Sequence, residues 1–213
     1  MKVLKNIFLL SILSLVSFIL IFINISHNGI LVKLDLIINS LFLQPNNGFH
    51  IVLSRIIGSI FDTLPIIILC LLLAFFILIK YSRKDSLFFL VVMLSSGIFI
   101  RVVKELVQRA RPVNSLISDN SFSFPSGTTT TAVVFCGLLI YLIFAKIKQS
   151  IVRKICIFSS VLIIILVGFS RVYLNVHWFS DVLGGLSIGT FILTFSIILK
   201  EILEKNINRS KIK

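Results

Sequence analysis

Long apolar runs alternate with short polar segments along nearly the whole chain. Six of the runs approach the ~20 residues that an α-helix needs to cross the hydrocarbon core of a bilayer. They cover residues 7–25, 61–79, 86–103, 128–145, 155–172 and 182–199. We expect all six to be helices, because lipid cannot satisfy the hydrogen bonds of an open backbone. The pattern therefore predicts an all-α, polytopic membrane protein with six transmembrane helices in one bundle.

The segment between the first two runs is more polar. Pro45-Asn46-Asn47-Gly48 indicates a turn, and a short amphipathic stretch from His50 to Ile60 is expected to lie at the outer membrane interface. The first apolar run is longer than the core of a signal peptide and has no clear small-x-small cleavage site, so we expect it to be a retained helix.

Composition agrees with a membrane protein. Of 213 residues 57% are hydrophobic and 14% charged, and the mean hydropathy is +1.09, so we expect one membrane-embedded domain over residues 1–213. The net charge of +13 would suggest nucleic acid as the partner of a soluble protein. Here the cations lie between apolar runs, where they set topology and meet anionic lipid, so we expect no nucleic-acid partner. Cys70, Cys136 and Cys156 lack the spacing of a disulfide frame or a metal site.

The lysines and arginines fall unevenly on the two sides of the predicted bundle. Those of the N-terminus, the C-terminus and two alternate loops share one side, which the positive-inside rule makes cytoplasmic. The other side carries a smaller set of cations, and most of them belong to three polar clusters: 104–112, 123–127 and 170–181. We expect these cations to be kept for chemistry at the outer face.

The first cluster begins at Lys104 and ends at Arg111-Pro112. If the third helix continues past the membrane boundary and ends at Pro112, Lys104 and Arg111 lie two helical turns apart on one face and reach a single anion. The alternative interpretation is a cationic helix end whose side chains extend to lipid headgroups.

In the second cluster Pro125-Ser126-Gly127 directly precedes the fourth helix. The free amides at a helix N-terminus bind phosphate oxygens, Gly127 permits a close approach of the backbone, and Ser126 adds a hydroxyl. An ordinary Ser-Gly helix cap is the alternative.

The third cluster contains Arg171, His177 and Asp181. His177 and Asp181 are four residues apart, so on a helix the carboxylate accepts a hydrogen bond from one ring nitrogen and leaves the other nitrogen free to attack an electrophile. Arg171 would stabilise charge on phosphoryl oxygens. The alternative is an interfacial His177-Trp178 pair with a capping aspartate.

Together the three clusters resemble the signature motifs of the type 2 phosphatidic acid phosphatase family, which are membrane phosphatases related to vanadium haloperoxidases. The matching positions are Lys104 with Arg111-Pro112, then Pro125-Ser126-Gly127, then Ser170-Arg171 with His177 and Asp181. The order of the motifs and the six-helix pattern match as well. The second motif departs at its last position, where the family has a histidine and this chain has Thr128.

The resemblance implies catalysis without a metal or another cofactor. His177 would attack phosphorus to form a phosphohistidine, Asp181 would orient it, and water would release phosphate. The phosphoryl oxygens would be bound by Lys104, Arg111, Ser126, Gly127 and Arg171. The histidine missing at Thr128 is the general acid of the family, and a threonine hydroxyl is too weak an acid to replace it.

We therefore expect a membrane lipid phosphatase that hydrolyses a phosphomonoester or a diphosphate, with turnover impaired by Thr128. Phosphatidylglycerol phosphate, phosphatidic acid and undecaprenyl diphosphate are the substrates that the resemblance suggests. A non-catalytic lipid-phosphate-binding or regulatory membrane protein and a lipid phosphotransferase are the alternatives. Thr128 itself is either an introduced change or the natural residue of a diverged member. The expected location is a bacterial plasma membrane, with cytoplasmic termini and the site at the outer face; nothing in the sequence indicates a protein partner.

Overall fold

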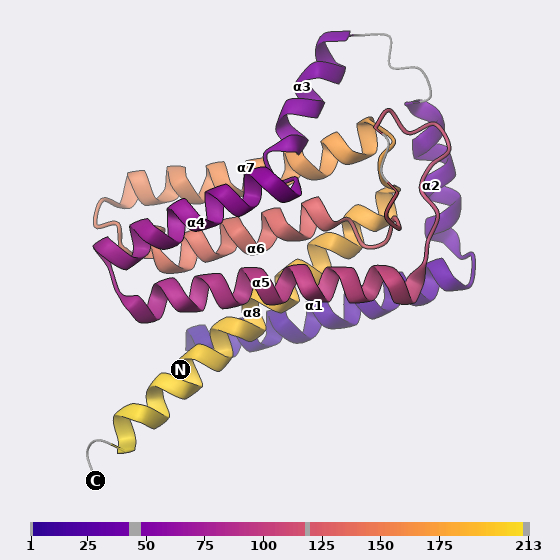
Figure 1. The fold of residues 1–213 in the computed structure, drawn as a ribbon. Coiled ribbons are helices and arrows are strands. Elements are labelled where there is room, and N and C mark those ends of the chain that lie inside the picture. The colour runs from indigo at the N-terminus through magenta and orange to yellow at the C-terminus, as the bar shows by residue number, and fades with distance from the viewer. Residues whose placement is uncertain (1, 43–47, 118–119, 211–213) are drawn as a thin grey trace.

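All regular elements in the described part of the chain are helices (Figure 1). The computed structural model describes residues 2–42, 48–117 and 120–210. Within these ranges there are eight α-helices and one short 3-10 helix, Phe144–Lys146. The α-helices are α1 (Lys2–Ser26), α2 (Ile30–Leu41), α3 (Gly48–Ser59), α4 (Thr63–Lys80), α5 (Arg83–Val107), α6 (Gly127–Leu142), α7 (Ser150–Tyr173) and α8 (Phe179–Ser210).

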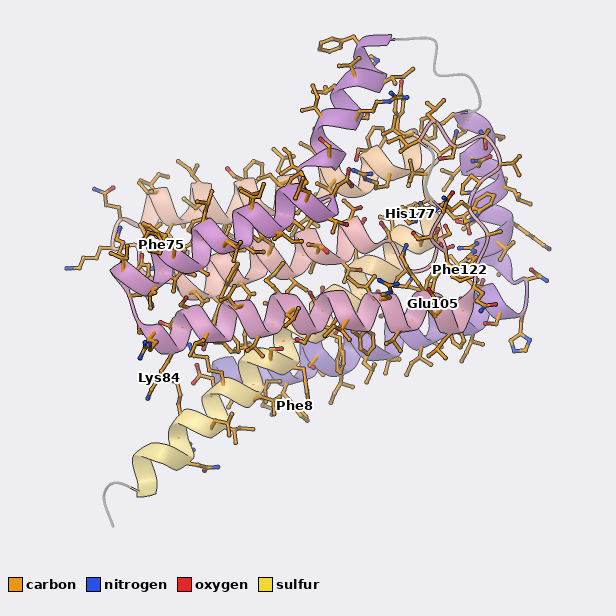
Figure 2. The ribbon with its side chains drawn as sticks, in the orientation of Figure 1. Phe8, Phe75, Lys84, Glu105, Phe122 and His177 are labelled. Carbon is orange, nitrogen blue, oxygen red and sulfur yellow. The ribbon has the colours of Figure 1, made fainter. Side chains whose placement is uncertain are left out.

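Six of these helices, α1 and α4 to α8, are long and apolar enough to cross a membrane. They coincide with the six predicted runs, so the predicted all-α bundle of six transmembrane helices is confirmed. Large apolar side chains cover the outside of the bundle, as lipid contact requires. Phe8 and Phe75 in Figure 2 are examples, and both are more than half exposed in the isolated chain.

Helix α6 lies at the centre of the bundle. It contacts α5, α7 and α8, and nine of its 16 residues are buried. Its Leu138 packs in a core that also contains Phe89 of α5, Val167 of α7 and Ile188 of α8. The start of α6 is thereby held in the middle of one end of the bundle.

That end gathers the polar segments of the chain (Figure 1). Because successive membrane helices run in opposite directions, the α5–α6 loop and the α7–α8 turn lie at the same end, together with α2 and α3. The other end carries the α4–α5 and α6–α7 connections. The three polar clusters of the sequence therefore converge, although 77 residues separate Lys104 from Asp181.

Two features near this end differ from the prediction. Helix α2 was not predicted, because its apolar run is too short for a membrane span and carries Lys33 and Asp35. Helix α3 corresponds to the predicted stretch from His50 to Ile60. The predicted turn at Pro45-Asn46-Asn47 lies outside the described residues.

The backbone of α8 approaches α6 closely at two glycines. A Cβ atom on Gly185 would lie 2.8 Å from the Ser126 carbonyl oxygen, and one on Gly189 would lie 2.9 Å from Val133 Cβ and 3.0 Å from the Thr130 carbonyl oxygen. Small residues four apart bring helices together in membranes, where apolar burial cannot drive association. These glycines set the distance between the two helices.

Gly189→Ala is expected to destabilise the protein by about 1–3 kcal/mol, because the added methyl meets backbone that cannot move aside. Gly97→Ala is the matched control, since a Cβ on Gly97 of α5 meets nothing within 4 Å. Alanine there should leave stability unchanged or raise it slightly, as helix propensity predicts. Thermal unfolding in detergent measures both, and equal midpoints for the two variants would contradict the packing argument.

Candidate phosphate-binding site

His177 lies in the tight turn between α7 and α8. The backbone N–H groups of Val176 and His177 both donate to the Arg171 carbonyl oxygen, at 3.0 and 3.2 Å. Asn175 adopts a left-handed conformation with φ 52°, and its side chain bonds Asn39 and the Phe42 carbonyl. These hydrogen bonds hold the turn in place. His177 is buried there, with 4% of the residue exposed.

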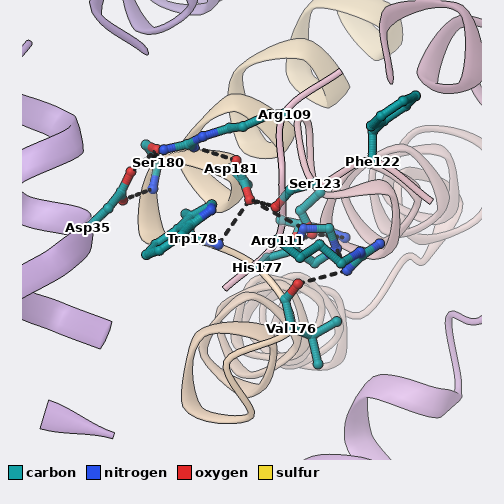
Figure 3. Close-up of polar contacts among 12 residues, drawn as sticks. Asp35, Arg109, Arg111, Phe122, Ser123, Val176, His177, Trp178, Ser180 and Asp181 are labelled. Atoms are coloured by element: carbon teal, nitrogen blue, oxygen red, sulfur yellow. Dashed lines mark hydrogen bonds and ion pairs between the residues drawn. The ribbon is translucent and has the colours of Figure 1, made fainter. Parts of the chain in front are cut away.

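The two ring nitrogens of His177 face different groups (Figure 3). Nδ1 lies 3.4 Å from Asp181 Oδ2, and Nε2 lies 3.3 Å from the Arg111 guanidinium. Because Arg111 can only donate, Nε2 is the acceptor nitrogen and Nδ1 carries the proton. Among the described residues Nδ1 has no formed hydrogen bond. Catalytic hydrogen bonds often tighten only when substrate is bound.

Burial lowers the pKa of His177 from 6.5 to about 4. The Asp181 carboxylate opposes this shift, while the positive charges of Arg111 and Lys104 add to it. His177 is therefore neutral near pH 7, and its acceptor nitrogen carries the lone pair that a nucleophile needs.

The Asp181 carboxylate is fully buried and organises the groups around it. Oδ1 accepts from Arg109 at 2.6 Å, while Oδ2 accepts from the Trp178 N–H at 2.9 Å and from the Ser123 hydroxyl. Helix α8 begins at Phe179, so His177 precedes the helix and does not lie on its face as predicted. The spacing of four residues still brings His177 and Asp181 together, because the Asp181 side chain points towards the start of α8 and accepts the Trp178 N–H.

A second buried carboxylate, Asp35 of α2, completes this network (Figure 3). Its oxygens accept from Arg109 at 2.7 Å, from the Ser180 N–H at 2.8 Å and from the Ser180 hydroxyl at 2.5 Å. Arg109 is thus clamped between Asp35 and Asp181. Asp35 was not among the predicted site residues. The available signal was a lone carboxylate within an apolar run, which requires a buried partner.

Lys104 and Arg111 converge on one loop residue, although not by the predicted route. Helix α5 ends at Val107, and Gln108 is left-handed with φ 50°, so the prediction of one helix running to Pro112 was wrong. The chain turns back instead. Lys104 Nζ and Arg111 Nη2 then donate to the Ser121 hydroxyl from 3.1 and 3.0 Å.

Arg171 reaches the same region from the last turn of α7. It is 3% exposed, and its guanidinium lies 3.5 Å from Asp62 at the start of α4. Gly58 of α3 packs directly on it, since a Cβ there would lie 1.7 Å from the guanidinium. Gly58 therefore makes room for the buried Arg171.

The start of α6 supplies three predicted site residues. Ser126 caps the helix, with its hydroxyl 2.9 Å from that of Thr129, and it is fully buried. Contact between the Ser126 hydroxyl and phosphate stays a prediction. Gly127 faces Lys104, because its Cβ would lie 3.9 Å from Lys104 Cε. Thr128 follows at the first turn of the helix.

A cavity of about 1070 Å³ joins these groups to an apolar groove. Its polar end is lined by six of the eight predicted site residues: Lys104, Arg111, Gly127, Thr128, Arg171 and His177. Asp181 and Ser126 lie behind this wall. The cavity continues between α4 and α5 along apolar side chains that include Leu71, Leu90 and Leu94. One end therefore suits a phosphate and the other an alkyl chain.

Comparison with known proteins finds a matching family model and two similar phosphatases. Residues 85–203 match the model of the PAP2 superfamily. Phosphatidylglycerophosphatase B of Bacillus subtilis (strain 168) is 37% identical over 113 residues, which cover 51% of this chain and 56% of the relative. A probable lipid phosphate phosphatase 4 of Arabidopsis thaliana is 36% identical over 91 residues, or 40% of this chain and 30% of the relative. The chain thus spans about half the length of the first relative and less of the second.

The fold matches a solved structure over nearly its full length. The crystal structure of a transmembrane PAP2-type phosphatidylglycerolphosphate phosphatase from Bacillus subtilis superposes with a TM-score of 0.83 at 25% identity. The match covers 90% of this chain and 96% of that one. The structural match therefore extends beyond the family segment, residues 85–203.

Asp35→Ala is expected to lower stability by roughly 1–3 kcal/mol, because Arg109 and the Ser180 N–H each lose a buried partner. Asp35→Asn keeps one acceptor oxygen and should cost less. Thermal unfolding in detergent gives both values. Unfolding midpoints that match the unchanged protein would show that the contacts of Asp35 do not hold α2 to the α5–α6 loop and to α8.

His177 is expected to stay neutral until the pH falls towards 4. The chain has three histidines, so a His27→Gln, His50→Gln variant isolates the ring of His177 for NMR. Its ring signals should stay constant from about pH 8 to about pH 5, below the usual range for histidine. A titration midpoint near 6.5 would contradict the effect of burial.

Proposed function

The chain belongs to the PAP2 superfamily, and on that premise we propose that it is a membrane lipid phosphatase acting through a phosphohistidine at His177. One observation carries the proposal: a neutral imidazole and three cations share one cavity with an apolar groove between membrane-spanning helices. The substrate is a phosphomonoester or diphosphate of a lipid. Phosphatidylglycerol phosphate, phosphatidic acid and undecaprenyl diphosphate are the candidates, and the name of the Bacillus subtilis relative supports the first.

Lys104, Arg111 and Arg171 bind the phosphoryl oxygens. Arg111 and Arg171 present planar forks that pair with two oxygens each, while Lys104 supplies a point charge. The cavity wall is partly apolar, so these charges act more strongly than they would in water. We assign neutralisation of the phosphate charge to these three cations.

The first chemical step is the attack of His177 Nε2 on phosphorus. The N–P bond forms as the P–O bond to the lipid breaks, and the imidazole gains positive charge. Asp181 stabilises that charge through the Nδ1 proton, and Arg109 and Ser123 hold the carboxylate in place. Before substrate binds, the Arg111 guanidinium faces His177 Nε2. When substrate is bound, it turns to the phosphoryl oxygens. Water then attacks the phosphohistidine, releases phosphate and restores neutral His177.

Thr128 limits the rate of the first step. The departing lipid oxygen needs a proton, and a threonine hydroxyl does not release one near neutral pH, so the proton comes from water. This residue favours a second candidate function, in which the chain binds lipid phosphate with little or no turnover. Phosphoryl transfer from His177 to another lipid or sugar is a third, and it would yield a phosphorylated acceptor instead of free phosphate.

The proposal includes an orientation. The site faces outward, both termini are cytoplasmic, and residues 1–213 act as one membrane-embedded unit in a bacterial plasma membrane. The distribution of cations supports this, because the end of the bundle opposite the site carries Lys80, Arg83, Lys84 and most of the remaining lysines.

Thr128→His is expected to raise phosphate release by roughly 100- to 10,000-fold, because it supplies the missing general acid. Release of inorganic phosphate from the three candidate lipids in mixed micelles measures the change. Thr131→His is the matched control, since position 131 lies one turn further along α6 and lines the same cavity.

A large gain at position 128 without a gain at 131 would support a phosphatase impaired at one residue. If Thr128→His binds the lipids but releases no phosphate, the chain is a lipid-phosphate-binding protein. Phosphate found on an added lipid or sugar acceptor would identify a phosphotransferase.

A further inference from the structure

Among the described residues that line the cavity, Arg101 is a cation that the phosphoryl site does not use. Arg101 lies on α5, three residues before Lys104, and lines the same wall. A rise of three helical residues places it about 4.5 Å further along the helix, towards the middle of the membrane span. Arg101 thus lies between the phosphoryl-binding cluster and the apolar groove.

Arg101 is an exposed charge within the membrane-spanning segment Arg83–Val107. In residues 2–42, 48–117 and 120–210 its guanidinium forms no hydrogen bond and no ion pair, although Glu105 lies one turn away on the same wall. An arginine inside a membrane span is costly, and such residues face a cavity and meet an anion. Within the described part of the chain, no side chain supplies that anion.

The groove remains open on the membrane side of Arg101. Gly97 lies one turn further along α5, and a Cβ there would meet nothing within 4 Å. Leu94, Leu90 and, across the groove, Leu71 continue the wall. Along the cavity the order is therefore a phosphoryl-binding cluster, a single arginine, an open turn and an apolar channel.

We propose that Arg101 binds a second phosphate of the substrate, on the lipid side of the phosphoryl group that His177 attacks. The inference rests on the proposed function and adds the substrate class: lipids with two phosphates are preferred over lipids with one. The planar fork of Arg101 pairs with two oxygens of that phosphate. The second phosphate is joined to the first either directly, as in an isoprenyl diphosphate, or through glycerol, as in phosphatidylglycerol phosphate.

The test compares three lipids on the full chain in detergent micelles: phosphatidylglycerol phosphate, an isoprenyl diphosphate and phosphatidic acid. Trp178, the one tryptophan of the sequence, adjoins His177, so its fluorescence reports binding at the site. Phosphate release is followed in parallel. Arg101→Gln is expected to weaken binding of a two-phosphate lipid by roughly 10-fold or more, the value of a charge-assisted hydrogen bond, and to change phosphatidic acid little. Arg101→Lys should fall between.

Lys33→Gln is the matched control. Lys33 of α2 is exposed near the same end of the bundle but does not line the cavity, so its loss removes one charge without touching the site. It should affect all three lipids alike. A selective loss for the diphosphate alone, or for phosphatidylglycerol phosphate alone, would support the inference and identify the linkage.

Equal weakening of all three lipids by Arg101→Gln would overturn the inference, because it would show a general charge effect; no change for any lipid would overturn it too. Both results would leave the proposed function standing. If the unchanged chain neither binds nor dephosphorylates any of the three, the proposed function fails and the inference fails with it.

Discussion

The Asp181 carboxylate is the group on which the arrangement of the site depends. It is completely buried, and a buried charge persists only when its oxygens are fully paired. Its partners come from three separate parts of the chain: Ser123 and Arg109 in the α5–α6 loop, Trp178 at the start of α8, and, through Arg109, Asp35 of α2. The Asp181 carbonyl oxygen also accepts the Ser126 N–H at 3.0 Å. One residue therefore fixes the loop, the start of α6 and the turn that carries His177.

This network separates positioning from binding. Asp35, Arg109 and Asp181 satisfy one another behind the cavity wall, while Lys104, Arg111 and Arg171 line the cavity itself. Arg109 forms ion pairs with two carboxylates, Asp35 and Asp181, so it adds little positive potential to the cavity. The buried imidazole stays neutral because burial and the neighbouring cations destabilise its protonated form more than Asp181 stabilises it. A neutral imidazole beside several cations is a combination that suits the binding of a phosphate dianion.

The sequence was sufficient to predict the six membrane helices, because each apolar run is long enough to span the bilayer and lipid admits no other structure there. It also predicted that Lys104, Arg111, Gly127, Thr128, Arg171 and His177 meet, because alternate helix directions bring their segments to one end. It did not predict how the chain turns after α5. Gln108 has an uncommon left-handed conformation that no local signal required. The prediction that Arg111 reaches the cavity on a continuous helix was therefore wrong. Helix α2 and the roles of Asp35 and Gly58 depend on tertiary partners 74 to 145 residues away, which periodicity does not reveal.

The structure of the full chain with bound orthovanadate tests the central claim most directly. Vanadate adopts the five-coordinate geometry of a phosphoryl group under attack, and its binding does not need the acid that Thr128 fails to supply. If His177 is the nucleophile, vanadium will be bonded to His177 Nε2, and its oxygens will be held by Lys104, Arg111 and Arg171. Vanadate bound elsewhere, or bound at these cations with His177 turned away from it, would contradict the assignment of His177 as the nucleophile.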